Sequence, residues 1–482
     1  TLSSAESIPG SGAFDAQIIV DGTDTCRVTG PANSTFNATG DNSELPGFRT
    51  KQVLSLNNTK LLFEENVLVR IGSGGFDFGA GNPTKIDGIL EIAGGGYAIN
   101  NSCYYGDESL LRFSNGFDYQ VDATDVTWDA GDIASANPGI PYNVAASGDN
   151  STELVLNSPR SLRNDLTITG SQFTLTTNSG TFEIGGDWNR SGITSAFNPN
   201  GQEVIFNGEN PQTINTFDGI LSEEFFKLTF ANTGIKTLQE DVTVLDSLKI
   251  ENNGNLDLNG QTIFLGGNWN NLAGEAEFSE SGTVRIFGDS TQVISCPGGE
   301  VFDELIVENS SELSQGVIIE DNIRVNVNLS MIEGIIHPGS NEEVILGLNA
   351  TNSGGDFKSY VNGVVRKDGF ASTAAYDFPV GYFDVNGGDT ISVWQPAAIL
   401  PQSISSALNF DIRYFHENAV PGTNYPSNPP NTETILETAS TCNYWDINRS
   451  GATIDAQVRL FWNDSTTCFD INNPLLLRVA RY

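Results

Sequence analysis

The chain has 482 residues, with 23 basic and 60 acidic side chains, and therefore a formal net charge of −37. This charge disfavours nucleic acid and anionic membrane surfaces as partners, because both would be repelled. The chain contains 51 glycines, and Asn, Ser, Thr and Asp dominate its polar positions. Such a composition is typical of many short strands joined by tight turns and argues against a helical protein.

The first part of the chain shows strand-like texture without a clear period. Short apolar runs occur at 61–63, 67–69, 89–92 and 110–113. We expect a cap and irregular rungs over residues 1–160, because the end of a stacked fold must cover its open core and its unpaired edge. The opening segment TLSSAESIPG lacks the basic and apolar regions of a signal peptide, which predicts a chain already processed after export. The sequence contains no run of 18 apolar residues, so we predict no membrane span.

Residues 161–355 contain an internal repeat. GGDWN recurs as GGNWN, which places Trp188 and Trp269 81 residues apart. The blocks that follow match in the same order: GQEVIFNG at 201–208 with GTVRIFGD at 282–289, PQTI with TQVI, FFKLTFANTG with FDELIVENSS, and DVTVLDSLKI with NIRVNVNLSM. This alignment predicts that Trp188 and Trp269 occupy equivalent positions, and likewise Phe206 and Phe287.

The repeat is built of alternating apolar runs of four to six residues that end at Gly or Asn. The runs follow one another too closely for crossover helices, and a solenoid stacks each strand on its neighbour in the next rung. We therefore predict an all-β protein with a right-handed parallel β-solenoid (β-helix). A string of immunoglobulin-like sandwiches is the alternative. The absent Cys, Trp, Cys arrangement and the N-x-G-x-L-x-L-N-G ladder favour the solenoid.

After residue 355 the pattern changes again. SYVNGVVRKDG, AYDFPVGYFD, VRLFWND and LLLRVARY predict a C-terminal antiparallel β-sandwich-like module over residues 356–482, with Pro421 to Pro430 as a loop. The given chain ends on an apolar, β-prone segment. We therefore expect the native polypeptide to continue beyond Tyr482.

Several of these blocks together resemble one family. GGNWNN, LDLNGQTIFLGG, the F…L…NTG block and VNGVVRKDG…YDFPVGYFD are similar to parts of large surface proteins of gliding and surface-colonising bacteria that use type IX secretion, from about residue 110 to the end. The resemblance implies a secreted, extracellular cell-surface protein: an adhesin, a stalk or an appendage subunit. It implies other surface subunits, further copies of the chain, glycans, or a host or prey surface as partners. The family's sorting domain is not among these residues, so the secretion route rests on the resemblance.

The rival hypothesis is a polysaccharide-binding or polysaccharide-degrading β-helix protein, because such enzymes use clustered carboxylates. His337 and His416 stand outside known catalytic motifs, and Asp187, Asp241 and Asp257 lie where strands meet turns, where Asx side chains normally bond the backbone. We expect no enzyme activity, no catalytic residue and no cofactor, although the many carboxylates are compatible with structural calcium. A groove with several carboxylates beside an Arg or Lys would favour the rival.

Aromatic side chains on an exposed solenoid face can stack on sugar rings, and Trp188 and Trp269 are the candidates. Their repetition at one structural position favours packing inside each rung. Four D-[ST] triplets resemble the O-glycosylation sequon of the same bacteria, and the acceptors would be Ser247, Ser290, Thr390 and Ser465.

Five cysteines without CxxC spacing predict disulfides in an exported protein rather than a zinc site. We expect Cys442 to pair with Cys468 and Cys26 with Cys103, which leaves Cys296 free and buried.

Overall fold

A computed structural model describes most of residues 61–461 and, at the backbone level, three short strands before them. Within that range the undescribed positions are 66, 73–74, 79–83, 115–117, 149–151, 171–172, 192–195, 217–222, 275–277, 280, 314–315, 387–388 and 418–442. In the described part every regular element is a β-strand. No helix among these residues is long and apolar enough to cross a membrane. The all-β prediction is confirmed. The chain divides into two compact units, residues 1–261 and 262–482, and the division falls at neither of the predicted boundaries.

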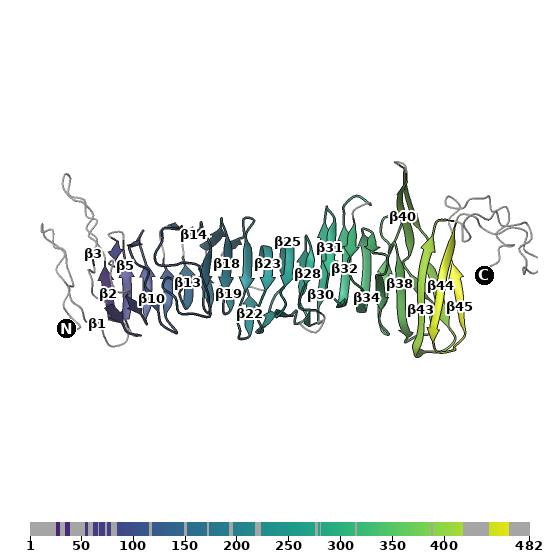
Figure 1. Cartoon of the computed structure of the whole chain (residues 1–482), viewed down its shortest axis with the longest axis horizontal. Helices are drawn as coiled ribbons and strands as arrows, with labels where there is room; N and C mark the ends of the chain where they lie inside the picture. The colour runs from purple at the N-terminus through teal and green to yellow at the C-terminus, as the bar shows by residue number, and fades with distance from the viewer. Residues whose placement is uncertain are drawn as a thin grey trace, which may run out of the picture. The chain divides into compact units, whose positions relative to one another are not determined.

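Unit 1 consists of rows of short strands. Within each row the strands lie side by side in the order in which they occur along the chain (Figure 1). Its longest row contains β2 (Ser34–Ala38), β5 (Val67–Ile71), β8 (Ile89–Ile92), β11 (Leu110–Phe113), β13 (Asn143–Ser147), β16 (Leu166–Thr169), β19 (Trp188–Ser191), β22 (Gln212–Asn215), β24 (Ile235–Leu238) and β26 (Asn255–Asp257). A second row contains β15 (Arg160–Leu162), β18 (Thr181–Ile184), β21 (Glu203–Phe206), β23 (Glu223–Phe230) and β25 (Val242–Ile250).

Three shorter rows complete the rungs of unit 1. They are β1 (Cys26–Val28), β4 (Leu61–Phe63), β7 (Lys85–Ile86) and β10 (Tyr104–Tyr105); β12 (Tyr119–Val121), β14 (Thr152–Leu156), β17 (Phe173–Thr177) and β20 (Ala196–Asn198); and β3 (Leu54–Ser55), β6 (Phe76–Asp77) and β9 (Ala98–Ile99). Neighbours such as β8 and β11, or β14 and β17, pair in parallel. Parallel pairing of strands consecutive within a row is the arrangement of a β-solenoid, which confirms this part of the prediction.

Unit 2 begins with the same parallel pairing and ends with antiparallel sheets. Its strands are β27 (Thr262–Leu265), β28 (Trp269–Asn271), β29 (Phe278–Ser279), β30 (Thr283–Gly288), β31 (Gln292–Ser295), β32 (Glu300–Asn309), β33 (Val317–Ile319), β34 (Ile323–Glu333), β35 (Ile336–Pro338), β36 (Glu343–Leu346), β37 (Thr351–Gly354), β38 (Val364–Phe370), β39 (Tyr376–Phe378), β40 (Gly381–Asn386), β41 (Asp389–Trp394), β42 (Ala397–Pro401), β43 (Ser405–Phe415), β44 (Tyr444–Gly451) and β45 (Ala456–Leu460).

The change of direction in unit 2 takes place at β38. This strand pairs in parallel with β36 and antiparallel with β43. After it, β43 and β44, β39 and β42, β42 and β45, and β40 and β41 all pair antiparallel. The predicted C-terminal antiparallel module is therefore present among the described residues.

The core of each unit consists of columns of inward side chains that stack from rung to rung. In unit 1 the register joins Ile184, Phe206, Phe230 and Ile250 across β18, β21, β23 and β25. All four are fully buried. Alternate residues of a strand face opposite sides, so a parallel register repeats the same apolar face in every rung.

One predicted equivalence is wrong. Phe206 is fully buried in β21, whereas Phe287 is half-buried in β30 and lies opposite Glu308. The buried residue of β30 at this place is Ile286, 80 residues after Phe206 rather than 81. The sequence alignment was one residue out of register over these strands, and such a slip moves every side chain to the other face.

Candidate functional site

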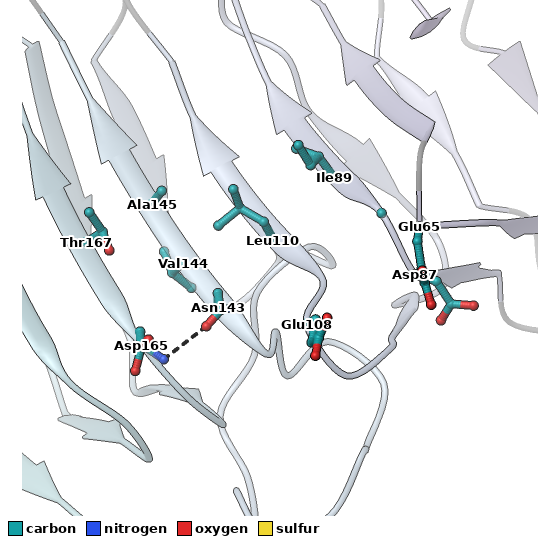
Figure 2. A pocket seen from close by; sticks show the side chains of 11 residues that line it. Glu65, Asp87, Ile89, Glu108, Leu110, Asn143, Val144, Ala145, Asp165 and Thr167 are labelled. Atoms are coloured by element: carbon teal, nitrogen blue, oxygen red, sulfur yellow. Dashed lines mark hydrogen bonds between the residues drawn. The ribbon is translucent and has the colours of Figure 1, made fainter. Parts of the chain in front are cut away.

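The described surface of unit 1 carries a groove of about 580 Å³, lined by one row of acidic side chains and one of apolar side chains (Figure 2). The acidic row contains Glu65, Asp87, Glu108 and Asp165. The groove therefore presents negative charge along one side.

The acids form a row because each precedes a strand of the same sheet. Glu65 comes before β5, Asp87 before β8, Glu108 before β11 and Asp165 before β16. Neighbouring strands lie roughly 4.8 Å apart, and Asp87 and Glu108 each stand two residues before the paired Ile89 and Leu110, so these two acids are level on adjacent strands. Glu65 is one residue out of this register, and Asp165 lies two strands beyond Glu108. Asn143, which opens β13, pairs in register with Leu110 and is level with Asp165, two residues further along the strand direction than Glu108. Figure 2 shows the five side chains along the strand ends.

The apolar side of the groove comes from an outward-facing column. Parallel register joins Leu68, Ile89 and Leu110 across β5, β8 and β11. All three are only half-buried, whereas their inward neighbours are buried. An aliphatic column on the outer face of a sheet offers apolar contact to a bound molecule.

Beside this column the same strands carry an ion-pair ladder. Glu91 in β8 accepts a hydrogen bond at 2.6 Å from Arg70 Nε on β5 and another from Arg112 Nη2 on β11. Burial by itself would raise the pKa of Glu91, but the two arginines outweigh it and hold that pKa below its usual value. The ladder fixes the outer face next to the groove.

Asp165 has a structural partner already. Its Oδ1 accepts the backbone N–H of Asp187 at 2.8 Å, and the Asn143 Oδ1 accepts the N–H of Asp165 at 3.2 Å. Asp187 Oδ1 in turn accepts the N–H of Thr213 at 2.7 Å. This Asx ladder, Asn143 to Thr213, confirms that Asp187 bonds the backbone, as predicted. Burial and the Asp187 charge raise the pKa of Asp165, while the Asp187 N–H opposes the shift.

The groove is lined by acidic, aliphatic and neutral polar groups, and Lys85 lies beside it in addition to the arginines of the ladder. Lys85 Nζ lies 2.7 Å from Asp87 Oδ1. No set of three or more His, Cys, Asp or Glu side chains that could hold a metal ion occurs among the residues the structure describes. Chemically, the arrangement suits a neutral or cationic ligand with an apolar side, such as a sugar polymer or a basic chain.

The two tryptophans predicted as possible sugar platforms are inside the protein. Trp188 and Trp269 are 0% exposed. Their Nε1–H groups donate to Glu223 Oε2 at 3.0 Å and to Glu300 Oε2 at 2.6 Å. Glycan stacking on these rings is therefore excluded, and the packing interpretation is correct. Their equivalent partners also confirm that the two tryptophans occupy equivalent positions.

The two histidines have local structural contacts. His337 Nε2 donates to the carbonyl of Leu313 at 3.2 Å, its Nδ1 lies 3.4 Å from Asn362 Nδ2, and burial lowers its pKa. His416 Nδ1 lies 3.3 Å from Tyr414 Oη, and burial lowers its pKa as well. Neither lines the groove.

The two predicted disulfides have different outcomes. Cys442 and Cys468 lie outside the described residues, so that pairing stays a prediction. Cys103 and Cys296 are buried and form no disulfide, as was expected for Cys296 alone. The structure does not bring Cys26 and Cys103 together: β1 and β10 are separated by β4 and β7, about 14 Å in all, and a disulfide needs Cα atoms within about 7 Å.

The predicted glycan acceptors are spread over separate elements. Ser290 and Thr390 are exposed, the first in a turn and the second in β41. Ser247 in β25 is half-buried, and its hydroxyl lies 3.1 Å from Asp246 Oδ2. Ser465 lies outside the described residues. Glycosylation at these positions stays a prediction.

Sequence reasoning missed the groove and the buried carboxylates. The groove acids come from rungs 21 to 57 residues apart and share no motif, so only the stacking register brings them together. Glu223 and Glu300 had a readable signal, because each stands two residues before an aligned phenylalanine, in EEF and EVF. The aligned blocks began at the phenylalanine and left the glutamate out.

Comparison with known proteins returned no matching family model, no matching curated protein and no matching solved structure.

Proposed function

We propose that this chain is a secreted, extracellular and non-enzymatic structural and adhesive element of a bacterial cell surface. The observation that carries the proposal is the filled interior of successive rungs. In unit 2, for example, Val284, Leu305 and Leu329 form one buried column and Ile286, Val307 and Met331 another. A stack that buries the same face in every rung keeps its form without a cofactor or ligand, as a stalk requires.

The acidic surface supports the same proposal. A net charge of −37 keeps a secreted protein soluble and limits contact with polyanions. Its partners are therefore other surface subunits, further copies of the chain, or glycans on a neighbouring surface. We assign ligand contact to the groove between β5 and β16.

The finer points rest on the sequence resemblance. We propose that the solenoid coils to the right, that β38 to β45 form a β-sandwich, and that the protein leaves the cell by type IX secretion. A right-handed coil also follows the strong preference of parallel β connections.

A second candidate function is polysaccharide binding with cleavage, and the groove favours it. Asp87 and Glu108 are level on adjacent strands, so two carboxylates face the same stretch of the groove, and glycoside hydrolysis uses a pair of carboxylates. Lys85 beside Asp87 supplies a basic group. The Asx ladder counts against this candidate, because the Asp165 carboxylate already accepts a hydrogen bond from the backbone of the next rung.

The two candidates are separated by one experiment. Beads coated with the whole chain are presented to surfaces bearing neutral, cationic or anionic polysaccharides, while the supernatant is assayed for new reducing ends. We expect adhesion to neutral or cationic polymers and no new reducing ends. Steady release of reducing ends would replace the structural proposal with the enzymatic one.

A matched pair of variants locates the contact. Glu65→Gln with Glu108→Gln removes two groove charges, and Glu209→Gln with Glu224→Gln removes two exposed charges elsewhere in unit 1. Adhesion should fall at least severalfold in the first variant and stay unchanged in the second. Equal loss in both would show that overall charge, rather than the groove, governs contact.

A further inference from the structure

The two copies of the repeat each contain a buried tryptophan–glutamate pair. Trp188 packs edge-to-face on Phe225 at 5.3 Å, and Trp269 on Phe302 at 5.4 Å. In both copies the indole N–H donates to a glutamate Oε2. Glu223 and Glu300 are 2% and 1% exposed, so both carboxyls are shielded from water.

The copies differ in the next partner of the carboxyl. Two residues after Trp188, Arg190 Nε donates to Glu223 Oε2 at 2.8 Å, and this arginine is itself buried. Two residues after Trp269 stands Asn271, whose Nδ2 donates to Glu300 Oε2 at 2.9 Å. The second copy therefore has a neutral amide where the first has a cation.

Among the residues that the structure describes, the other groups around Glu300 supply no positive charge. The backbone N–H of Val301 donates to Oε1 at 3.1 Å, and the Cys296 thiol is the titratable side chain beside it. On β34 its partner in the register is Ile323, which is apolar. Asp321 accepts the backbone N–H of Cys296 at 3.1 Å, so the charged side chain bonded to this neighbour is acidic.

Charged residues further along the same elements do not change this. Asp303 and Glu304 on β32 are half-buried and are themselves acidic. Arg324, which follows Ile323, pairs with Asp368 at 2.9 Å. A carboxylate buried without a cation loses its hydration and regains only part of that energy from neutral hydrogen bonds.

We propose that Glu300 is a pH-sensitive lock in unit 2, where the successive rungs that contain β28, β31 and β32 hold the protonated acid and loosen when the acid ionises. Burial raises the pKa of Glu300, while hydrogen bonds from Trp269 and Asn271 oppose the shift. A raised folded-state pKa stabilises the rung fully below the unfolded pKa of about 4.3. That stability is then lost as the pH rises through the folded pKa. The contribution of Glu300 to the stability of these rungs is therefore largest at acidic pH.

The test is hydrogen exchange measured by mass spectrometry on the whole chain between pH 4.5 and 8, corrected for the intrinsic pH dependence of exchange. One proton links opening to pH, so opening of β32 should increase about tenfold per pH unit until the Glu300 pKa is passed. Glu300→Gln, which keeps the shape without the charge, should give a flat profile. Asn271→Arg, which supplies the missing cation, should flatten it as well.

Unit 1 provides the matched control. The strand β23, where Arg190 faces Glu223, should show a shallower slope than β32 in the wild-type protein, and Arg190→Asn should steepen it. A flat wild-type profile at β32, or a slope that survives in Glu300→Gln, would overturn the proposal.

A spectroscopic readout keeps the test independent of whether the variants fold. The indole N–H resonance of Trp269 should titrate in the wild-type protein with a midpoint above that of an ordinary glutamate, because this N–H donates to the titrating carboxyl. A Trp269 resonance that stays constant from pH 4.5 to 8 would also overturn the proposal.

Discussion

The two copies of the repeat place the same kinds of residue inside and differ in how the chain connects them. The tryptophans are 81 residues apart, the buried pair Phe206 and Ile286 is 80 apart, and Phe225 and Phe302 are 77 apart. The spacing between equivalent residues changes from block to block because the turns differ in length between the copies. The inward-facing register of each strand is kept. The two copies therefore keep the inward face of the strand and differ in length at the corners.

The largest expected effect tests that register. Phe206→Ala should destabilise unit 1 by about 3–5 kcal/mol, because it empties a fully buried position. Phe287→Ala, at the site that the sequence alignment equated with it, should cost less than about 1 kcal/mol, since that ring is only half-buried. Protection from hydrogen exchange in β21 and β30 measures both. Equal costs would mean that the 81-residue alignment is the correct register.

The second effect tests the difference between the buried carboxyls. Arg190→Ala leaves Glu223 buried without its cation and should cost about 3 kcal/mol, somewhat less than a full broken pair because Glu223 can take up a proton. Asn271→Ala should cost about 2 kcal/mol, since it removes the donor to Glu300 and the bonds that the same amide makes to the backbone of Ala273 and Gly274. Denaturation followed by exchange in each unit gives both values. Adding Glu223→Gln to Arg190→Ala should recover part of the loss.

The third effect concerns a feature that the copies share. Gln212 Nε2 donates to the carbonyls of Ile184 and Gly186, and Gln292 Nε2 to those of Leu265 and Gly267. Gln212→Leu and Gln292→Leu should each cost about 1–3 kcal/mol, because buried backbone groups lose their partner. The two losses should agree within about 0.5 kcal/mol if the sites are equivalent and independent. A large difference would limit the comparison to the tryptophan pair.

The smallest effect lies on the outer face. Arg285 in β30 pairs with Glu308 in β32, and both side chains are about one-third exposed. The first copy has Ile205 at the position of Arg285. Arg285→Ile should therefore change stability by less than about 1 kcal/mol, and high salt should reduce the difference. A larger change that is insensitive to salt would show that outer side chains also define the repeat.

The sequence predicted the fold class because parallel stacking leaves a local trace: short alternating runs, turn residues between them, and repeated blocks. The same signals located the antiparallel module and the packing role of Trp188. The strand register was harder to predict. IFNG at 205–208 and IFGD at 286–289 can be aligned at a spacing of either 80 or 81 residues, and this one-residue difference exchanges the inward and outward faces of the strand. The pairing of Cys26 with Cys103 failed on distance, which depends on the number of intervening rungs.

The groove could not be predicted from any single segment. Glu65, Asp87 and Glu108 are ordinary residues at the starts of strands, and only their stacking makes them one row. Glu223 and Glu300 were accessible in principle, because each precedes an aligned phenylalanine. A charged residue in an apolar repeat is the kind of signal that points to a buried polar network.

The side-chain bonds of the Asx ladder all run in one direction along the chain. Asn143, Asp165 and Asp187 each present an oxygen to a backbone N–H that arrives later in the chain. The acceptor oxygen of a completed rung is therefore already in position when the next segment of polypeptide pairs with that rung. A chain delivered from its N-terminus can add one turn at a time onto a finished template, without waiting for its distant end.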